Sequence, residues 1–240
     1  SRRYPALIFE QEREAGDQIL NIEQLSVSQD GTSLFKKVNL NLAKGDKVIV
    51  HSKDTRALEA FYNILMGEAQ ADSGSVSWGI TTSQAYLPVD HDDYFESPVS
   101  LVEWLRQYAK TEEEREEVFL RGFLGKMLFS GEEALKMSNV LSGGEKVRCM
   151  LSKMMMERAN VLVLNEPTNH LDLESITAFN NSLNNFKGTL LCSTSDHAFA
   201  QTLGNRIVEL TPNGMIDRHM SFDEYMTDPK IKELREKLYQ

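Results

Sequence analysis

The sequence has few cysteines and a deficit of basic side chains. Its only cysteines are Cys149 and Cys192; they show none of the paired spacings of zinc or redox sites, and we expect two reduced, buried thiols. There are 26 Lys and Arg against 36 Asp and Glu, a formal net charge of −10. Because nucleic-acid binding relies on neutralising phosphates, the composition carries no signal of direct nucleic-acid binding.

Long apolar runs are missing as well. No stretch reaches the roughly 18 apolar residues that cross a bilayer, and the first residues lack the short apolar core of a signal peptide. We therefore expect no membrane segment in this chain and a cytoplasmic location. With 240 residues, of which 41% are hydrophobic, the chain is long enough for one well-packed domain.

The apolar patterns that are present predict an α/β fold. Short alternating segments between residues 19 and 50 indicate a small antiparallel sheet that leads into a buried strand over 47–50. Apolar residues at helical spacing follow over 55–66, so that strand, loop and helix succeed one another. Continuous apolar runs, typical of strands buried on both faces of a parallel sheet, occur at 161–164, 189–192 and 206–210, with helices expected over 142–158 and 173–184.

A mainly helical stretch interrupts this alternation and predicts a separate lobe. It opens at Ser97-Pro98 and gives a helical lobe over about 98–140. The acidic run from Glu112 to Glu117 within it is typical of a solvated helix face. At the start of the chain, the charged residues 1–18 precede the first strand and have the character of a linker.

Two motifs carry the chemical signal. The first, Leu141-Ser142-Gly143-Gly144-Glu145, stands at the start of an expected helix. Backbone N–H groups freed by two glycines, a serine hydroxyl and the positive end of the helix dipole converge there, as binding of a terminal phosphate requires. The second motif follows the buried strand at 161–164 and reads Asn165-Glu166-Pro167-Thr168-Asn169-His170-Leu171-Asp172.

In this order and spacing the two motifs resemble the ATP-binding cassette (ABC) family, and the second motif resembles its ABC-F branch. The resemblance implies an ABC nucleotide-binding domain over residues 19–240, with a parallel core sheet, an antiparallel β subdomain and the helical lobe. ABC-F proteins carry two cassettes joined by a helical linker, and many act on the ribosome. Residues 1–18 would then end that linker. The chain would be the second cassette, with the first cassette of the same protein and the ribosome as partners.

The chain departs from the family where the phosphate-binding loop should follow the strand at 47–50. In place of Gly-x-x-Gly-x-Gly-Lys-Ser/Thr it has Ser52-Lys53-Asp54-Thr55-Arg56-Ala57-Leu58-Glu59. The three glycines thus become Ser52, Thr55 and Ala57, whose side chains obstruct the approach of phosphate to the backbone. Leu58 replaces the lysine that grips phosphate, and Glu59 replaces the hydroxyl that binds magnesium.

Other positions agree with the loss of this site. Asp54 or Thr55 is suited to cap the following helix, which would occupy N–H groups that phosphate needs. Asn165 stands where the family holds Mg²⁺ with an aspartate, beside the retained carboxylate Glu166. Ser195 stands at the position of the family's switch histidine, and His197 lies too late in the sequence to replace it.

The resemblance also implies how such a cassette can still act. In the family two cassettes close head to tail, so that each ATP with its Mg²⁺ lies between the phosphate loop of one and the LSGGE motif of the other. Here ATP and Mg²⁺ would be held mainly by the partner cassette, and Ser142, Gly143, Gly144 and Glu145 would complete that site in trans. Glu166 would be a retained but orphaned catalytic carboxylate.

Several alternatives stay open at this stage. His170 and Asp172 are candidates for communication across the cassette interface, although Asp172 is also suited to cap the next helix. The isolated domain is expected to be inactive as an ATPase. It could instead be an inert pseudo-cassette that only docks to a partner, or the ATP-binding subunit of a transporter; the form of the second motif and the missing membrane segment count against the transporter.

Overall fold

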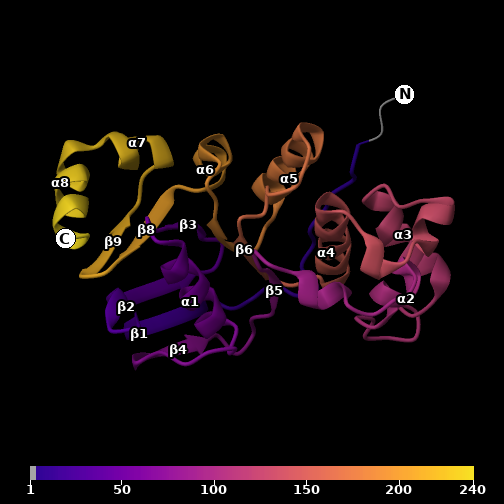
Figure 1. Ribbon diagram of the computed structural model, residues 1–240, viewed down its shortest axis with the longest axis horizontal. Coiled ribbons are helices and arrows are strands. Elements are labelled where there is room, and N and C mark those ends of the chain that lie inside the picture. The colour runs from indigo at the N-terminus through magenta and orange to yellow at the C-terminus, as the bar shows by residue number, and fades with distance from the viewer. Residues whose placement is uncertain (1–3) are drawn as a thin grey trace.

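A six-stranded sheet forms the centre of the molecule. The computed structural model describes residues 4–240 and is shown in Figure 1. The sheet has the order β5-β6-β7-β3-β8-β9, and all neighbouring strands are parallel except the pair β8 and β9. The strands are β3 (Lys47–His51), β5 (Gln84–Leu87), β6 (Val161–Asn165), β7 (Thr189–Ser193), β8 (Arg206–Thr211) and β9 (Gly214–Arg218).

A second, antiparallel sheet packs against one face of the first. It has the order β2-β1-β4, with β1 (Gln18–Gln29), β2 (Thr32–Ala43) and β4 (Ser73–Trp78). Side chains alternate across a strand, so Val48 and Val50 of β3 pack in one apolar cluster with the antiparallel sheet and α1 (Thr55–Leu65), whereas Ile49 between them belongs to the cluster on the opposite face. The expected α/β fold with its antiparallel subdomain is thereby confirmed.

The remaining helices divide between the opposite face and a separate lobe. The opposite face carries α4 (Gly143–Glu157), α5 (Leu173–Asn185), α6 (His197–Leu203) and α7 (Phe222–Thr227). The lobe lies at one end of the molecule, and the C-terminal helix lies at the other (Figure 1). The lobe comprises α2 (Leu101–Arg106), α3 (Glu117–Lys126) and the 3₁₀ turns η2 (Gly131–Leu135) and η3 (Ser138–Val140); η1 (Asp92–Phe95) precedes it, and α8 (Pro229–Leu238) closes the chain.

The acidic run does not form the helix face that the sequence predicts. Residues 111–116 form turns, and α3 begins only at Glu117. Thr111 donates its hydroxyl hydrogen bond to Glu114 and accepts one from the Glu114 N–H, which fixes a local turn. A helix here would place like charges one turn apart, where they repel.

The segment before β1 packs closely onto the domain. Leu7 and Phe9 are buried, and the Phe9 ring lies 6.0 Å from that of Phe179 in α5. The Ala6 N–H donates to the Lys126 carbonyl, and the Glu12 N–H to the Arg158 carbonyl. The assignment of 1–18 as the end of a linker stays a prediction; residues 1–3 lie outside the described residues. Among residues 4–240, no helix is long and apolar enough to cross a membrane.

Candidate functional site

The loop between β3 and α1 uses its own N–H groups internally. Asp54 caps α1, as the sequence predicts: its Oδ1 accepts from the Arg56 N–H at 3.0 Å, and its carbonyl accepts from the Ala57 N–H. The Asp54 N–H in turn donates to Ser52 Oγ at 3.2 Å. The Asp54 carboxylate therefore stands at the positive end of the helix dipole, where an anion would bind.

A salt bridge holds that carboxylate in place. Arg56 donates from its Nη2 to Asp54 Oδ2 at 2.9 Å and from its Nε to Oδ1 at 3.1 Å. The Arg56 guanidinium hydrogen bond lowers the pKa of Asp54 and outweighs its partial burial. The protein thus supplies its own anion to this helix start and keeps it ionised.

The other replaced loop positions also lack phosphate-binding groups. Ala57 and Leu58 are buried in the apolar cluster beneath the antiparallel sheet, so Leu58 points into the core and not toward a ligand. Thr55, the first residue of α1, and Glu59, one turn later, are exposed. Among the described residues, none of these four side chains makes a hydrogen bond to another side chain across the loop.

A residue from the C-terminal end of the chain completes the loop, and sequence reasoning did not find it. The Tyr239 hydroxyl accepts from the Lys53 N–H at 3.0 Å and donates to Glu209 Oε2 at 2.5 Å. Glu209 is fully buried and also accepts from Tyr225 and Arg235. The only sequence signal was a glutamate inside an apolar strand, which indicates a buried charge in need of donors.

At the ends of the neighbouring strands β6 and β7, Glu166 and Ser195 lie together. Glu166 Oε2 accepts from the Ser195 N–H at 3.0 Å and from its hydroxyl at 3.1 Å. Glu166 has a positive φ of 53°, and its N–H donates to the Ser193 carbonyl. Asn165 beside it is only 4% exposed as a residue, and among the described residues its side-chain amide makes no hydrogen bond and is not fully buried.

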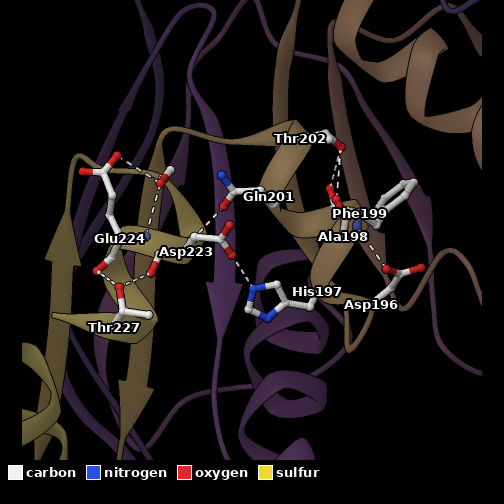
Figure 2. Close-up of polar contacts among 10 residues, drawn as sticks. Asp196, His197, Ala198, Phe199, Gln201, Thr202, Asp223, Glu224 and Thr227 are labelled. Carbon is white, nitrogen blue, oxygen red and sulfur yellow. Dashed lines mark hydrogen bonds and ion pairs between the residues drawn. The ribbon is translucent and has the colours of Figure 1, made fainter.

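The His197 side chain contacts α7, and among the described residues it makes no hydrogen bond to Glu166. Figure 2 shows its ring directed toward α7, where Nε2 contacts Asp223 Oδ1 at 2.5 Å. The Asp223 N–H is held by Gln201 Oε1 at 2.7 Å, so the pair joins the start of α6 to the start of α7. That His197 lies too late in the sequence to take the switch position stays a prediction.

The LSGGE motif differs from the loop before α1 in the hydrogen bonding of its backbone N–H groups. Ser142 is the exposed N-cap of α4, and it forms a capping box with Glu145: the Glu145 N–H donates to Ser142 Oγ at 3.2 Å, and the Ser142 N–H to Glu145 Oε1 at 3.1 Å. Burial alone would raise the pKa of Glu145, but Lys136 and the Ser142 hydrogen bonds lower it. Among the described residues the N–H groups of Gly143 and Gly144 have no acceptor, so two donors at this helix start stay open.

The two glycines also have a packing role. A Cβ at Gly143 would lie 2.9 Å from Cγ of His170, and a Cβ at Gly144 would lie 2.7 Å from the His170 carbonyl oxygen. His170 itself is exposed and has a positive φ of 67°. The structure thus brings the first motif and the centre of the second motif into contact, which the sequence alone did not indicate.

Asp172 caps helix α5, which is the second of the two roles that the sequence allowed for it. Its Oδ1 accepts from the Ser175 N–H at 2.8 Å at the start of α5, and hydrogen bonds from Ser175 lower its pKa.

Both cysteines are buried and free, as expected. Burial raises the pKa of each thiol, which leaves them unreactive.

Comparison with known proteins agrees with this arrangement. The family model described as "ABC transporter" matches residues 60–169. The chain is 51% identical over its whole length to the uncharacterized ABC transporter ATP-binding protein YkpA of Bacillus subtilis, of which it covers 44%. It is 27% identical over 84% of its length to the energy-dependent translational throttle protein EttA of Haemophilus influenzae, of which it covers 36%. The chain therefore spans less than half of these relatives.

Solved structures show the same fold at low identity. An ATP-binding cassette of an ABC transporter in its ADP conformation matches 90% of this chain and is itself covered to 98%, with a TM-score of 0.67 and 16% identity. That likeness concerns the fold alone. With its fold, its two motifs and its relatives in agreement, the chain belongs to the ATP-binding cassette family.

Proposed function

We propose that this cassette holds no nucleotide at its own loop and completes the ATP site of a partner cassette with its LSGGE motif. The carrying observation is the contrast between two helix starts. At α1 the N–H groups of Lys53, Asp54 and Arg56 are occupied by Tyr239, Ser52 and Asp54, respectively. At α4 the N–H groups of Gly143 and Gly144 have no acceptor among the described residues.

Without the phosphate-binding lysine and the magnesium-binding aspartate, hydrolysis at the cassette's own site would be very slow. Removal of one preorganised charge-stabilising group costs about 3–4 kcal/mol of transition-state stabilisation. Loss of both the lysine, now Leu58, and the magnesium aspartate, now Asn165, would cost roughly 6–8 kcal/mol, or about 10⁴–10⁶ in rate, if the effects add. The family match, which begins at residue 60 directly after the loop, supports the same conclusion.

The retained carboxylate fits an orphaned role. Glu166 would be the catalytic base of this cassette's own site, but Ser195 holds its Oε2 with two hydrogen bonds. With no nucleotide at the loop, it has no water to activate. His170, which packs against both glycines of the LSGGE motif, would transmit closure of the partner site to the second motif.

We infer the biological setting from the relatives. The resemblance of the second motif to the ABC-F branch and the similarity to the translational throttle protein EttA support a cytoplasmic, ribosome-associated translation factor. The partner cassette would be the first cassette of the same protein, which would hold ATP and Mg²⁺. The net charge of −10 indicates that ribosome contact lies mainly outside this segment.

The test is ATP hydrolysis by the intact protein that contains this chain, with Ser142→Arg. An arginine at this exposed helix start would fill the space of a terminal phosphate, and we expect hydrolysis to fall by at least about 100-fold, comparable to loss of one transition-state donor. Ser97→Arg, the same change at another exposed serine, is the matched control and should keep full activity.

Two results would contradict the proposal. Unchanged hydrolysis in Ser142→Arg would show that the motif does not serve a partner site and would favour an inert docking module. Binding of ATP-Mg²⁺ to the cassette alone would show that the loop still holds nucleotide. Thermal unfolding of both variants separates these outcomes from loss of the Ser142 cap, which alone costs about 1 kcal/mol.

A further inference from the structure

An acidic, aromatic pocket lies where the carboxyl ends of β5 and β6 meet α1. Its cavity of about 140 Å³ is lined by ten residues, among them Glu59, Glu68, Asp90, Asp93, Tyr86 and Asn165. Ligands of α/β folds bind outside the carboxyl ends of parallel strands. This pocket is therefore in a binding position, and it includes two of the positions that lost their nucleotide-binding residues, Glu59 and Asn165.

The pocket carries negative charge without compensation. Four of the ten lining residues are Asp or Glu, and none is Lys or Arg. Among the described residues, the side chains of Glu59, Glu68 and Asp93 form no ion pair and no hydrogen bond. Lys153, whose ammonium lies 5.7 Å from the centre of the Tyr94 ring, is neutralised by Glu157. Phosphate, nucleotide and nucleic acid are repelled from such a pocket.

A buried polar group faces the pocket with no partner. Asn165 is 4% exposed and lines the cavity at the end of β6, and its amide has no hydrogen-bond partner among the described residues. The amide is not among the fully buried polar atoms that lack a partner, so it is accessible from the cavity. A ligand with N–H donors would satisfy its Oδ1, which is an observation independent of the carboxylates.

The shape and the chemistry of the lining distinguish between cations. No group of three or more His, Cys, Asp or Glu among residues 4–240 is placed to hold a metal ion. The Tyr86 ring contributes an aromatic wall beside Glu59 and Glu68, whose charges, after burial, raise the pKa of its hydroxyl. A planar guanidinium stacks on aromatic rings and binds carboxylates and amide oxygens through five N–H donors. The cavity is also smaller than the about 300 Å³ of ordinary small-molecule sites.

We propose that the vacated nucleotide site has become a binding pocket for an arginine side chain of a partner protein. The guanidinium would lie against Tyr86, donate to Asn165 Oδ1 and pair with the surrounding carboxylates. The site would thus accept a cation from a protein surface where the family accepts a nucleotide anion. The inference rests on one part of the proposed function, namely that the loop holds no nucleotide.

The test is a ligand-observed NMR titration of the intact protein with the peptide Gly-Arg-Gly. We expect saturable binding, on the order of millimolar for one side chain, several-fold weaker binding of Gly-Lys-Gly, and none of the uncharged Gly-citrulline-Gly. The double variant Glu68→Gln with Asp93→Asn should weaken Gly-Arg-Gly by about tenfold or more. Glu112→Gln with Glu113→Gln, an equal loss of exposed charge outside the pocket, should change it less than about twofold.

Three outcomes would overturn the inference. They are equal binding of the citrulline peptide, equal weakening by the two double variants, and saturable Mg²⁺ binding that the Glu68 and Asp93 changes abolish. A parallel titration with ATP-Mg²⁺ keeps the two proposals apart. Because the partner cassette is expected to bind one ATP, binding of a second ATP per protein refutes the closed loop, whereas one bound ATP with no arginine binding refutes only the arginine pocket. All four substituted carboxylates are exposed, so folding should be unaffected, and thermal unfolding checks this.

Discussion

Substitution of Tyr239 by phenylalanine tests whether the C-terminal helix α8 holds the loop between β3 and α1 in its observed form. The change removes one hydroxyl that accepts from the Lys53 N–H and donates to Glu209 Oε2. Glu209 Oε1 keeps its two donors, Tyr225 and Arg235, but Oε2 loses the only donor it has among the described residues. A hydrogen bond to a buried charge contributes about 1.5–3 kcal/mol, whereas water can replace the bond to the exposed Lys53 N–H.

We therefore expect Tyr239→Phe to lower the free energy of unfolding by about 2 kcal/mol. For a domain of this size the melting temperature should fall by about 4–8 °C. Urea denaturation and a thermal scan measure these changes. Tyr225→Phe is the matched control, because it removes a hydroxyl from the same carboxylate without touching the loop.

Amide hydrogen exchange distinguishes loop closure from general stability. In Tyr239→Phe the Lys53 N–H should exchange faster under native conditions, and in Tyr225→Phe it should not, even if both variants lose similar stability. A loss of less than about 0.5 kcal/mol in Tyr239→Phe would refute the energetic argument. Equal Lys53 exchange in the two variants would refute the closure of the loop by Tyr239.

Two further predictions concern the LSGGE motif and the buried histidine. Gly144→Ala places a methyl group 2.7 Å from the His170 carbonyl oxygen, and we expect it to lower the free energy of unfolding by about 1–3 kcal/mol in urea denaturation and to reduce ATP hydrolysis at the partner site. The control is Gly122→Ala in α3, where a Cβ meets nothing within 4 Å and the free energy of unfolding should rise by about 0.5–1 kcal/mol. An unchanged stability of Gly144→Ala would contradict the packing against His170. Burial lowers the pKa of His91 despite the neighbouring aspartates. As the pH falls, the histidine of the unfolded chain, with a pKa near 6.5, is therefore protonated before that of the folded protein. The stability contributed by neutral His91 is present above about pH 6.5 and is lost as the pH falls below it. Unfolding free energies between pH 7.5 and 5.5 should therefore decrease less steeply in His91→Gln, and an unchanged slope would show that His91 does not titrate differently in the folded state.

The sequence predicted those parts of the site that depend on near neighbours. The Asp54 cap and the turn into α1 involve residues within a few positions of one another, and the short continuous apolar run of β6 favours a buried strand. The expected α/β fold followed from the same kind of pattern. The Asp172 cap was also visible as one of two interpretations.

The sequence could not predict contacts between distant segments. Tyr239 reaches Lys53 across 186 positions, and nothing near either residue marks the pair. Likewise, the need for Gly143 and Gly144 comes from His170, which a different loop brings to them. One signal was overlooked: Leu7, Ile8 and Phe9 form an apolar run within a charged segment, and the structure buries Leu7 and Phe9 while Ile8 between them is exposed.

The distance in sequence between Lys53 and Tyr239 also orders events during protein synthesis. The core strand β3 and helix α1 leave the translating ribosome long before residue 239 is made, so the nascent loop lacks its last hydrogen-bond acceptor while most of the cassette is already exposed. Domains generally fold as units as they emerge. The Lys53 N–H of this cassette therefore has its Tyr239 acceptor only once helix α8 has been made and has packed onto the domain.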